Sequence, residues 1–486
     1  MKVGPDEEVA LDETVSLPAG LRGPVTVTWT LKDGAESVAA TASYFGVQPV
    51  CKRVEPRLSV NVLFGSPEQT LAVMREFGIG GARLWGPCRN WDMDFGYAYT
   101  KLFHDAGIRT LLVMGMPQLV HDGRPLRSET LLPADTTEWF ARQVALIDAH
   151  RGEVDVYEFL NEYNIWQGRL KSPDPTRFAE PTMERYVAAV AAFRPLLRRH
   201  DPDALLAGCA TCSTDLSFIG RFLEQGGGRH VDMITEHAYS GNPDCPDYAK
   251  KLDTGLALAR AAGVAKWAQT EAGATSPNHL TPGLIHPRAL DQVSNDLRNM
   301  LIAWARGLDH FSHFMLATGR AGTDWNLTYL GNAENDFEDL PKPALFAFRA
   351  AADLLASAPC TAEAKLAGGC KGYVFDRGSR RVAAVWKWNG GTAALKPSAA
   401  LTGAVWTDAM GNRLKPGAIE LSGYPVYCVS ALTAADLSRA LEASPRTATA
   451  GADEAADASD PNLLLLQPDG VAPPRVRTSS KTKKPL

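Results

Sequence analysis

The stretch from Tyr157 to Asn164 reads Tyr-Glu-Phe-Leu-Asn-Glu-Tyr-Asn, a strand-like run that closes on an Asn-Glu pair. A second strand-like run, Lys266-Trp267-Ala268-Gln269-Thr270-Glu271, also closes on a glutamate, 271 − 162 = 109 residues further along. That interval has room for two further strand-helix units and another helix. The two glutamates are therefore expected at the ends of separate buried strands.

Short apolar runs alternate with amphipathic helical patterns from about residue 45 to residue 358. Eight such units in this length are typical of a (β/α)₈ TIM barrel. A doubly wound sheet is the alternative, but Gly78-Ile79-Gly80-Gly81 precedes a strand and lacks the dinucleotide-binding glycine pattern. The expected strands are Tyr44–Val47, Gly81–Trp85, Thr110–Met114, Val156–Leu160, Leu205–Gly208, Met233–His237, Lys266–Thr270 and His310–Leu316.

The regions on either side of the barrel have a different periodicity. Residues 1–44 carry β-prone runs separated by turn signals, and they are expected to pair with strands elsewhere. Residues 359–443 return to a period of two, which predicts a small antiparallel β-sandwich packed on the barrel. Residues 444–486 are rich in Ala, Asp, Pro, Ser and Lys, a composition typical of a disordered tail.

Charge and composition exclude several classes of partner. The net charge is −5 and no basic stripe is present, so nucleic-acid binding is not expected. No apolar run reaches the length of a membrane span, so no membrane partner is expected. The N-terminus lacks the apolar segment of a signal peptide, which indicates a cytoplasmic protein if the chain is complete and an exported one if a signal was removed. Oligomeric state is not readable from the sequence.

The cysteines and histidines do not form a recognisable metal motif, and no cofactor or metal is expected. Cys209 and Cys212 form an isolated C-x-x-C without a second pair. His310 and His313 are three residues apart, which in a strand places them on opposite faces. Cys360 and Cys370 are candidates for a disulfide if the protein is exported.

Polar residues fall where a barrel of this kind carries its catalytic groups, at the carboxyl ends of the strands. Asn161 and Glu162 close the fourth strand, and Glu271 closes the seventh. Arg83 lies in the second strand, while His237 and Tyr239 close the sixth. Two carboxylates at separate strand ends are what acid-assisted cleavage of a glycosidic bond requires.

Over most of residues 45–358 the chain resembles the clan A glycoside hydrolases, which share the eightfold barrel. In that clan the fourth strand ends in Asn-Glu and the seventh in a glutamate, matched here by Asn161-Glu162 and Glu271. A second-strand arginine and a sixth-strand His-x-Tyr match Arg83 and His237-Ala238-Tyr239. The sequence of residues 161–166 is similar to the Asn-Glu-Pro-Asn signature of family 39 and its neighbours, with Tyr163 in place of proline.

The resemblance implies a retaining O-glycoside hydrolase that cleaves β-linked glycosides by double displacement. Glu162 would be the acid/base and Glu271 the nucleophile, supported by Arg83 and Tyr239. The partner would be a glycoside or an oligo- or polysaccharide, with exo action favoured by the length of the loops. An inactive carbohydrate-binding barrel and an endo-acting polysaccharide hydrolase are the alternatives.

Amide and aromatic side chains are expected to bind the substrate. Asn161 is expected to bind the sugar 2-hydroxyl, and Trp166 and Trp325 are the candidate sugar platforms. The clan commonly carries a tryptophan at the end of the eighth strand, where this chain has Phe311-Ser312-His313-Phe314-Met315. Trp325, in the following loop, is the candidate substitute.

Overall fold

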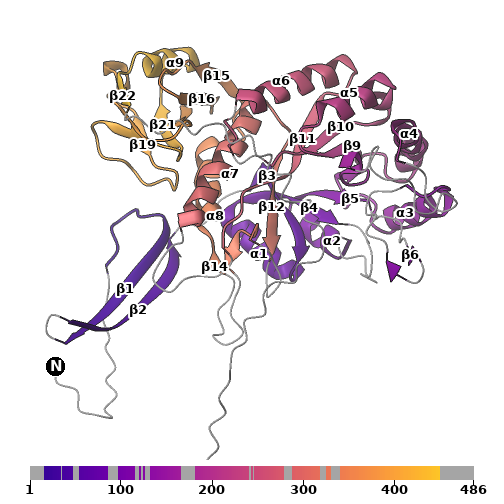
Figure 1. Ribbon diagram of the computed structural model, residues 1–486, viewed down its shortest axis with the longest axis horizontal. Coiled ribbons are helices and arrows are strands. Elements are labelled where there is room, and N and C mark those ends of the chain that lie inside the picture. The colour runs from indigo at the N-terminus through magenta and orange to yellow at the C-terminus, as the bar shows by residue number, and fades with distance from the viewer. Residues whose placement is uncertain are drawn as a thin grey trace, which may run out of the picture.

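A computed structural model shows a barrel flanked by a smaller β-domain and an N-terminal hairpin (Figure 1). Descriptions below cover residues 16–33, 36–47, 54–85, 97–114, 120–121, 124–125, 132–165, 181–239, 242–244, 246–277, 287–317, 324–329 and 340–448.

Eight parallel strands close on themselves in the order β10-β11-β12-β3-β4-β5-β8-β9, so the TIM barrel is confirmed. Each strand is followed by helical structure that packs outside the barrel, which places all eight carboxyl ends at one rim. The strands are β3 (Glu55–Phe64), β4 (Ile79–Trp85), β5 (Arg109–Val113), β8 (Val156–Glu158), β9 (Leu205–Cys212), β10 (Met233–His237), β11 (Lys266–Ala272) and β12 (Phe311–Ala317).

The outer helices enclose the core of the barrel with their apolar faces. They are α1 (Pro67–Phe77), α2 (Tyr97–Asp105), α3 (Thr137–Ala149), α4 (Met183–His200), α5 (Leu216–Glu224), α6 (Pro246–Ala261), α7 (Pro287–Ala305) and α8 (Pro343–Leu355). Short pieces lie between them: η1 (Tyr163–Ile165), η2 (Gly227–His230), β6 (Val120–His121), β7 (Arg124–Pro125), β13 (Thr328–Tyr329) and β14 (Leu340–Pro341).

Local sequence explains where the first helix begins and ends. The Ser66 hydroxyl accepts a hydrogen bond from the Gln69 amide at 3.3 Å, and Pro67 occupies the first turn, where its missing N–H costs nothing. Gly78 ends the helix at φ +69°, in the left-handed region that glycine adopts without a steric penalty. Strand β4 begins at the next residue, so this cap aims Arg83 into the barrel.

The first barrel strand is not the one expected. It is β3 (Glu55–Phe64), whereas Tyr44–Val47 belongs to β2 (Glu36–Val47). A four-residue apolar run does not by itself distinguish a barrel strand from a hairpin strand. The position of the following helix makes this distinction. Helix α1 begins at Pro67, which is a short βα connection after Phe64 but twenty residues after Val47.

The N-terminal strands pair with each other rather than with the sandwich. β1 (Gly23–Asp33) and β2 form an antiparallel hairpin that projects from the body in Figure 1. The base of the hairpin is anchored on both neighbours. Arg22 and Asn412 exchange two hydrogen bonds, at 2.7 and 3.0 Å, and Gly46 lies so close to the Phe346 ring that a Cβ would meet it at 2.2 Å. The β-prone run at residues 9–11 lies outside the described residues.

The C-terminal domain has two antiparallel sheets around its own apolar core, as expected of an accessory sandwich. One sheet has the order β15-β16-β17-β21-β19 and the other β20-β18-β22, with helix α9 (Ala434–Glu442) alongside. The strands are β15 (Cys360–Ala364), β16 (Cys370–Asp376), β17 (Arg381–Lys387), β18 (Ala393–Leu395), β19 (Val405–Thr407), β20 (Ile419–Leu421), β21 (Val426–Ser430) and β22 (Arg446–Ala448), with η3 (Ala399–Leu401) between.

Two expectations for this domain need correction. Residues 446–448, at the start of the expected tail, form β22 and pair with β18, while residues 449–486 lie outside the described part. Cys360 and Cys370 are free thiols. Cys360 lies opposite Phe375, so Cys370 is five residues, or roughly 16 Å, further along β16, which is too far for a disulfide.

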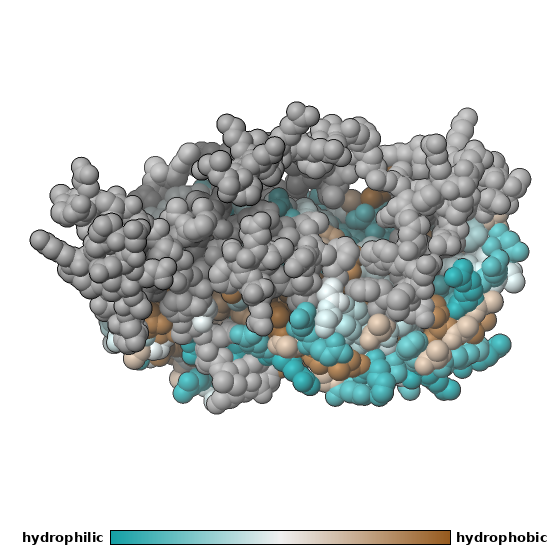
Figure 2. Space-filling model, turned by 90° about the horizontal axis from the view of Figure 1, so that it is seen from below, coloured by the Kyte–Doolittle hydropathy of each residue, from teal (hydrophilic) through white to brown (hydrophobic). Residues whose placement is uncertain are grey.

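The coloured surface in Figure 2 is largely hydrophilic, with smaller apolar areas scattered across it. Among the described helices, none combines the length and apolar character needed to cross a membrane.

The carboxylate of Asp244 joins the sandwich to the barrel. Asp244 follows β10 and is fully buried. Its oxygens contact the Arg298 guanidinium at 2.6 Å, the Trp386 indole N–H at 3.0 Å and the Lys371 ammonium at 3.1 Å. Arg298 belongs to the barrel helix α7, whereas Trp386 and Lys371 belong to the sandwich, so one buried charge holds both domains to the loop after β10.

We expect Asp244→Ala to lower the free energy of unfolding by about 3–5 kcal/mol, because it leaves the buried Arg298 and the partly buried Lys371 without their counterion. Urea unfolding followed by far-UV circular dichroism measures this loss. Asp105→Ala, which removes only an exposed partner of Lys101, is the control and should change stability little. Equal stability of the two variants would contradict the assigned role.

Candidate functional site

The Arg83 guanidinium lies at the centre of the barrel mouth, fully buried, and contacts five polar side chains, four of them through oxygen atoms and His237 through a ring nitrogen. Its Nε and Nη2 donate to one oxygen of Glu158, at 2.7 and 2.5 Å. Its Nη1 donates to Glu271 Oε1 at 2.5 Å and to Asn61 Oδ1 at 2.9 Å. Nη2 also donates to Asn161 Oδ1 at 2.8 Å. Four strands or strand ends of the barrel are thus oriented around a single cation.

The central ion pairs stay charged despite complete burial. Burial by itself would lower the pKa of Arg83, but the carboxylates of Glu158 and Glu271 outweigh it and the pKa is raised. Burial would raise the pKa of Glu158, but Arg83 and His237 outweigh it and the pKa is lowered. The second oxygen of Glu158 accepts from the Thr270 hydroxyl at 2.8 Å. The interior of the barrel therefore holds a fixed positive and a fixed negative charge.

Glu271 is presented at the end of β11 with both carboxylate oxygens occupied. Oε1 accepts from Arg83, and Oε2 accepts from the Tyr239 hydroxyl at 2.7 Å. Burial, together with the charge of Glu271, raises the pKa of Tyr239 well above its usual value, so the hydroxyl remains a donor. Glu271 itself is 6% exposed. Its carboxylate is held in one orientation, with one edge toward the mouth of the barrel.

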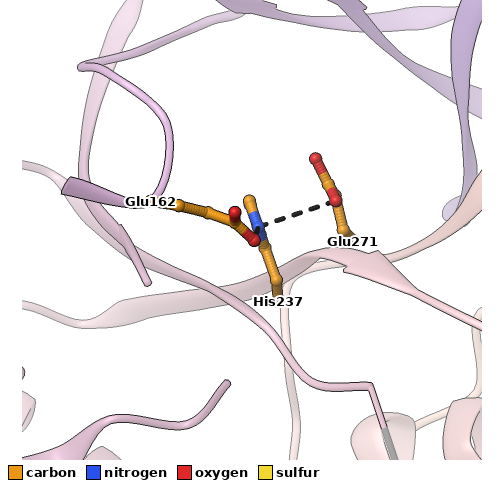
Figure 3. Close-up of side chains that lie close together, drawn as sticks. All are labelled: Glu162, His237 and Glu271. Atoms are coloured by element: carbon orange, nitrogen blue, oxygen red, sulfur yellow. Dashed lines mark hydrogen bonds and ion pairs between the residues drawn. The ribbon is translucent and has the colours of Figure 1, made fainter. Parts of the chain in front are cut away.

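His237 lies between the two glutamates (Figure 3). Its Nδ1 is 2.8 Å from Glu162 Oε1 and 3.6 Å from Glu271 Oε2. The other ring nitrogen, Nε2, faces Nη2 of Arg83 at 3.4 Å. Because a guanidinium can only donate, Nε2 must accept, and the tautomer with its proton on Nδ1 fits this network. Burial would lower the pKa of His237, but Glu271 and Glu162 outweigh it and the pKa is raised. His237 thus connects the two carboxylates electrostatically.

Glu162 leaves the strand geometry before it reaches the site. β8 ends at Glu158, and both Leu160 and Glu162 have positive φ, +62° and +52°. This region is uncommon for residues with a Cβ and persists where the surroundings hold it. The Glu162 amide donates to the Ala210 carbonyl at 2.8 Å, which secures the turn on the end of β9. The turn directs the half-buried carboxyl toward His237.

The two carboxylates are close together. One oxygen of Glu162, one oxygen of Glu271 and a ring nitrogen of His237 all lie within 4.8 Å of one another. Three such groups could in principle surround a metal ion. However, Arg83 and Tyr239 already occupy the Glu271 oxygens, and the guanidinium places a positive charge where a cation would bind. The donor set therefore fits a metal poorly and fits a pair of reacting carboxyls well.

The structure brings Trp325 to this site. The Trp325 ring contacts the Tyr239 ring edge-to-face, with 5.0 Å between ring centroids, and Phe314 at the end of the eighth strand lies 6.4 Å from the same Tyr239 ring. The other predicted platform, Trp166, lies outside the described residues, as do most of the long loops that would line a cleft. Tyr163, at the position of the proline in the Asn-Glu-Pro-Asn signature, is buried and stacks on Tyr186.

Two residues of the site escaped the sequence analysis. Glu158 is a charged residue inside an otherwise apolar strand-like run, and this was a readable signal, because a buried charge needs a partner. Asn61 was missed because β3 was not recognised as the first barrel strand. Its amide donates to the Thr270 carbonyl at 2.9 Å and so links β3 to β11.

Comparisons with known proteins bear on the fold. No protein-family model matches the chain, and no curated protein matches it. A family 30 endoxylanase from Clostridium papyrosolvens C71 aligns with a TM-score of 0.50 at 8% identity, over 78% of this chain and 97% of that one. A family 30 subfamily 8 xylanase from Clostridium acetobutylicum aligns with a TM-score of 0.50 at 9% identity, over 77% and 99%.

A third solved structure, a bifunctional glucanase-xylanase from a metagenome library, aligns with a TM-score of 0.50 at 11% identity, over 78% of this chain and 97% of that one. The resemblance to the clan A barrel is confirmed at the level of the fold. At sequence identities this low, a shared fold does not show that this chain has the activity of those enzymes. The exact family stays a prediction.

Glu236 precedes His237 and is fully buried. Its charge interactions are with His237 and with Lys251 and Tyr248 on α6. Burial raises the pKa of Glu236 to about 7. The folded protein thus holds this proton more tightly than the unfolded chain, whose carboxyl titrates near 4.5. Stability is lost as pH rises from about 4.5 through about 7.

We expect Glu236→Gln to remove this pH dependence. Between pH 4.5 and pH 8 the wild type should lose about 3 kcal/mol more unfolding free energy than the variant, from a difference of about 2.5 pH units. Urea unfolding at both pH values measures the difference. Parallel pH profiles for the two proteins would show that the buried carboxyl does not ionise in this range.

Proposed function

We propose that this protein is a retaining glycoside hydrolase that cleaves β-linked glycosides by double displacement. The observation that carries the proposal is the approach of Glu162 and Glu271, with carboxylate oxygens within 4.8 Å at the mouth of the barrel. Retaining enzymes hold their carboxyl groups about 5–5.5 Å apart, whereas inverting enzymes separate them by about 6.5–9.5 Å to admit a water molecule. The barrel would carry the catalysis, with the sandwich as an accessory domain.

In the first step Glu271 attacks the anomeric carbon and the bond to the leaving oxygen breaks. Glu162 donates a proton to that oxygen as it departs, and Glu271 becomes a glycosyl ester. In the second step Glu162, now ionised, takes a proton from water. The water oxygen attacks the anomeric carbon, the ester bond to Glu271 breaks, and the configuration is retained.

The neighbours of the two glutamates suit these roles. Arg83 donates a charge-assisted hydrogen bond to Glu271 and would hold it in line for attack. Tyr239 donates to the other oxygen, which orients the lone pairs of Glu271. His237 contacts Glu162, so the hydrogen bond between them would respond when Glu162 loses its proton in the first step and regains one in the second. Because the Asn161 oxygen already accepts from Arg83, its NH₂ group is the part suited to the sugar 2-hydroxyl.

The reaction is tested by a substrate screen with aryl β-glycosides, xylan and mixed β-glucan. The polysaccharides are included because structures with this fold include xylanases and a glucanase-xylanase. Proton NMR during hydrolysis identifies the first anomer formed, and product lengths separate exo from endo action. Release of the inverted anomer would contradict double displacement, and binding without hydrolysis would indicate an inactive carbohydrate-binding barrel.

We expect Glu271→Ala to lose activity by on the order of 10⁴-fold or more, because the covalent intermediate is no longer formed. Azide should restore turnover and yield a glycosyl azide of inverted configuration, because a small anion fits the space left by the carboxylate. The product is identified by NMR. Substantial activity without added azide would rule out Glu271 as the nucleophile.

We expect Glu162→Ala to lose kcat/KM by roughly 10²–10⁴-fold on glycosides with poor leaving groups and far less on those with good ones. A good leaving group needs little protonation, and kcat/KM reports the glycosylation step. A series of aryl glycosides with different phenol acidities measures this contrast. Equal losses across the series would contradict the acid role.

A further inference from the structure

The segment that carries Trp325 is tied to its surroundings through its backbone. The Trp325 carbonyl accepts from the Met315 amide at 3.2 Å, and the Leu327 amide donates to the Met315 carbonyl at 3.0 Å. The Asp324 carbonyl accepts from the Ser276 amide at 2.8 Å, a few residues after Glu271. Residues 324–327 therefore lie against the end of β12, beside the nucleophile strand.

One buried side chain also binds this segment. His313, on β12, is fully buried, and its Nε2 lies 2.9 Å from the Trp325 carbonyl oxygen. A carbonyl can only accept, so Nε2 carries the proton. On the opposite side of the ring, Nδ1 lies 3.2 Å from an Asp296 oxygen on α7. The imidazole is thus in contact on both sides.

The chain leaving the nucleophile strand confines the same ring. Gly273, two residues after Glu271, has φ +146°, and a Cβ there would lie 2.7 Å from the His313 ring. Only glycine permits this approach. The imidazole therefore fills the gap between the exit of β11 and the Trp325 carbonyl.

We propose that His313 is a positioning residue that holds Trp325 against Tyr239 and thereby sets the affinity of the site for sugar. The inference rests on the proposed glycoside hydrolase function, because Trp325 acts only if a sugar binds there. His313 does not touch the reacting atoms. Its loss should weaken substrate binding much more than it slows the chemical step, because Glu162 and Glu271 keep their own partners.

The first experiment needs no substrate. Hydrogen–deuterium exchange with mass spectrometry is followed on peptides covering residues 324–329 in the wild type and in His313→Leu, which lacks the donor. We expect exchange in these peptides to rise at least about tenfold in the variant. His310→Leu is the matched control, because it removes another buried histidine, three residues earlier, that lies beside Asp309. Exchange in the control should match the wild type.

A second pair of variants keeps the test valid if His313→Leu folds poorly. His313→Gln places an amide N–H near the position of Nε2, whereas His313→Asn is too short to reach the Trp325 carbonyl. We expect the Gln variant to keep wild-type exchange and the Asn variant to lose protection. Both substitutions remain polar, so a general loss of packing would affect them alike.

The third measurement is a comparison of KM and kcat on the best aryl glycoside from the screen. His313→Asn should raise KM roughly tenfold, the size of one lost aromatic contact, with kcat changed less than about threefold. In a protein that already carries Trp325→Ala, His313→Asn should not raise KM further. His313→Gln and His310→Leu should keep the wild-type KM.

The outcomes separate the two proposals. Unchanged exchange at residues 324–329 in both His313→Leu and His313→Asn overturns the positioning role, whether or not the protein is an enzyme. Altered exchange with an unchanged KM in an active protein overturns the link to sugar affinity. A wild type inactive on every glycoside contradicts the proposed function instead, and the exchange results still decide what His313 does to the segment.

Discussion

The ion-paired guanidinium of Arg83 is the interaction on which the rest of the site depends. It is fully buried, and it binds Glu158 on one edge and Glu271 on the other. A buried cation is costly unless its donors are all used, and here they reach side chains of β3, of β8 and the segment that follows it, and of β11. The barrel must therefore close in one register for the charge to be satisfied, and that register brings Glu271 to the mouth.

The sandwich is connected to the same rim of the barrel. Asp244 lies a few residues after Tyr239, in the loop that follows β10, and Trp386 and Lys371 of the sandwich contact its carboxylate. Tyr239 in turn donates to Glu271. The accessory domain thus contacts the loop that follows β10, next to the candidate site.

Much of this could be predicted because strand ends in a parallel barrel converge by geometry. Asn161, Glu162, His237 and Glu271 were recognisable once eight units had been counted, since every strand delivers its last residues to one rim. The first strand was wrong because a short apolar run does not reveal its pairing partner. Asn61 was lost with it, and Glu158 was overlooked although a charged residue inside an apolar run indicates a buried ion pair.

The sequence by itself determined the barrel and the residues at its rim, because apolar periodicity and strand order are local properties of the chain. Only the tertiary structure decided which partners those residues have. Glu158 shares Arg83 with Glu271, His237 lies between the carboxylates, and the Trp325 ring contacts the Tyr239 ring edge-to-face. These contacts join residues up to 188 positions apart, and such distances are set by how the whole chain packs rather than by any local pattern.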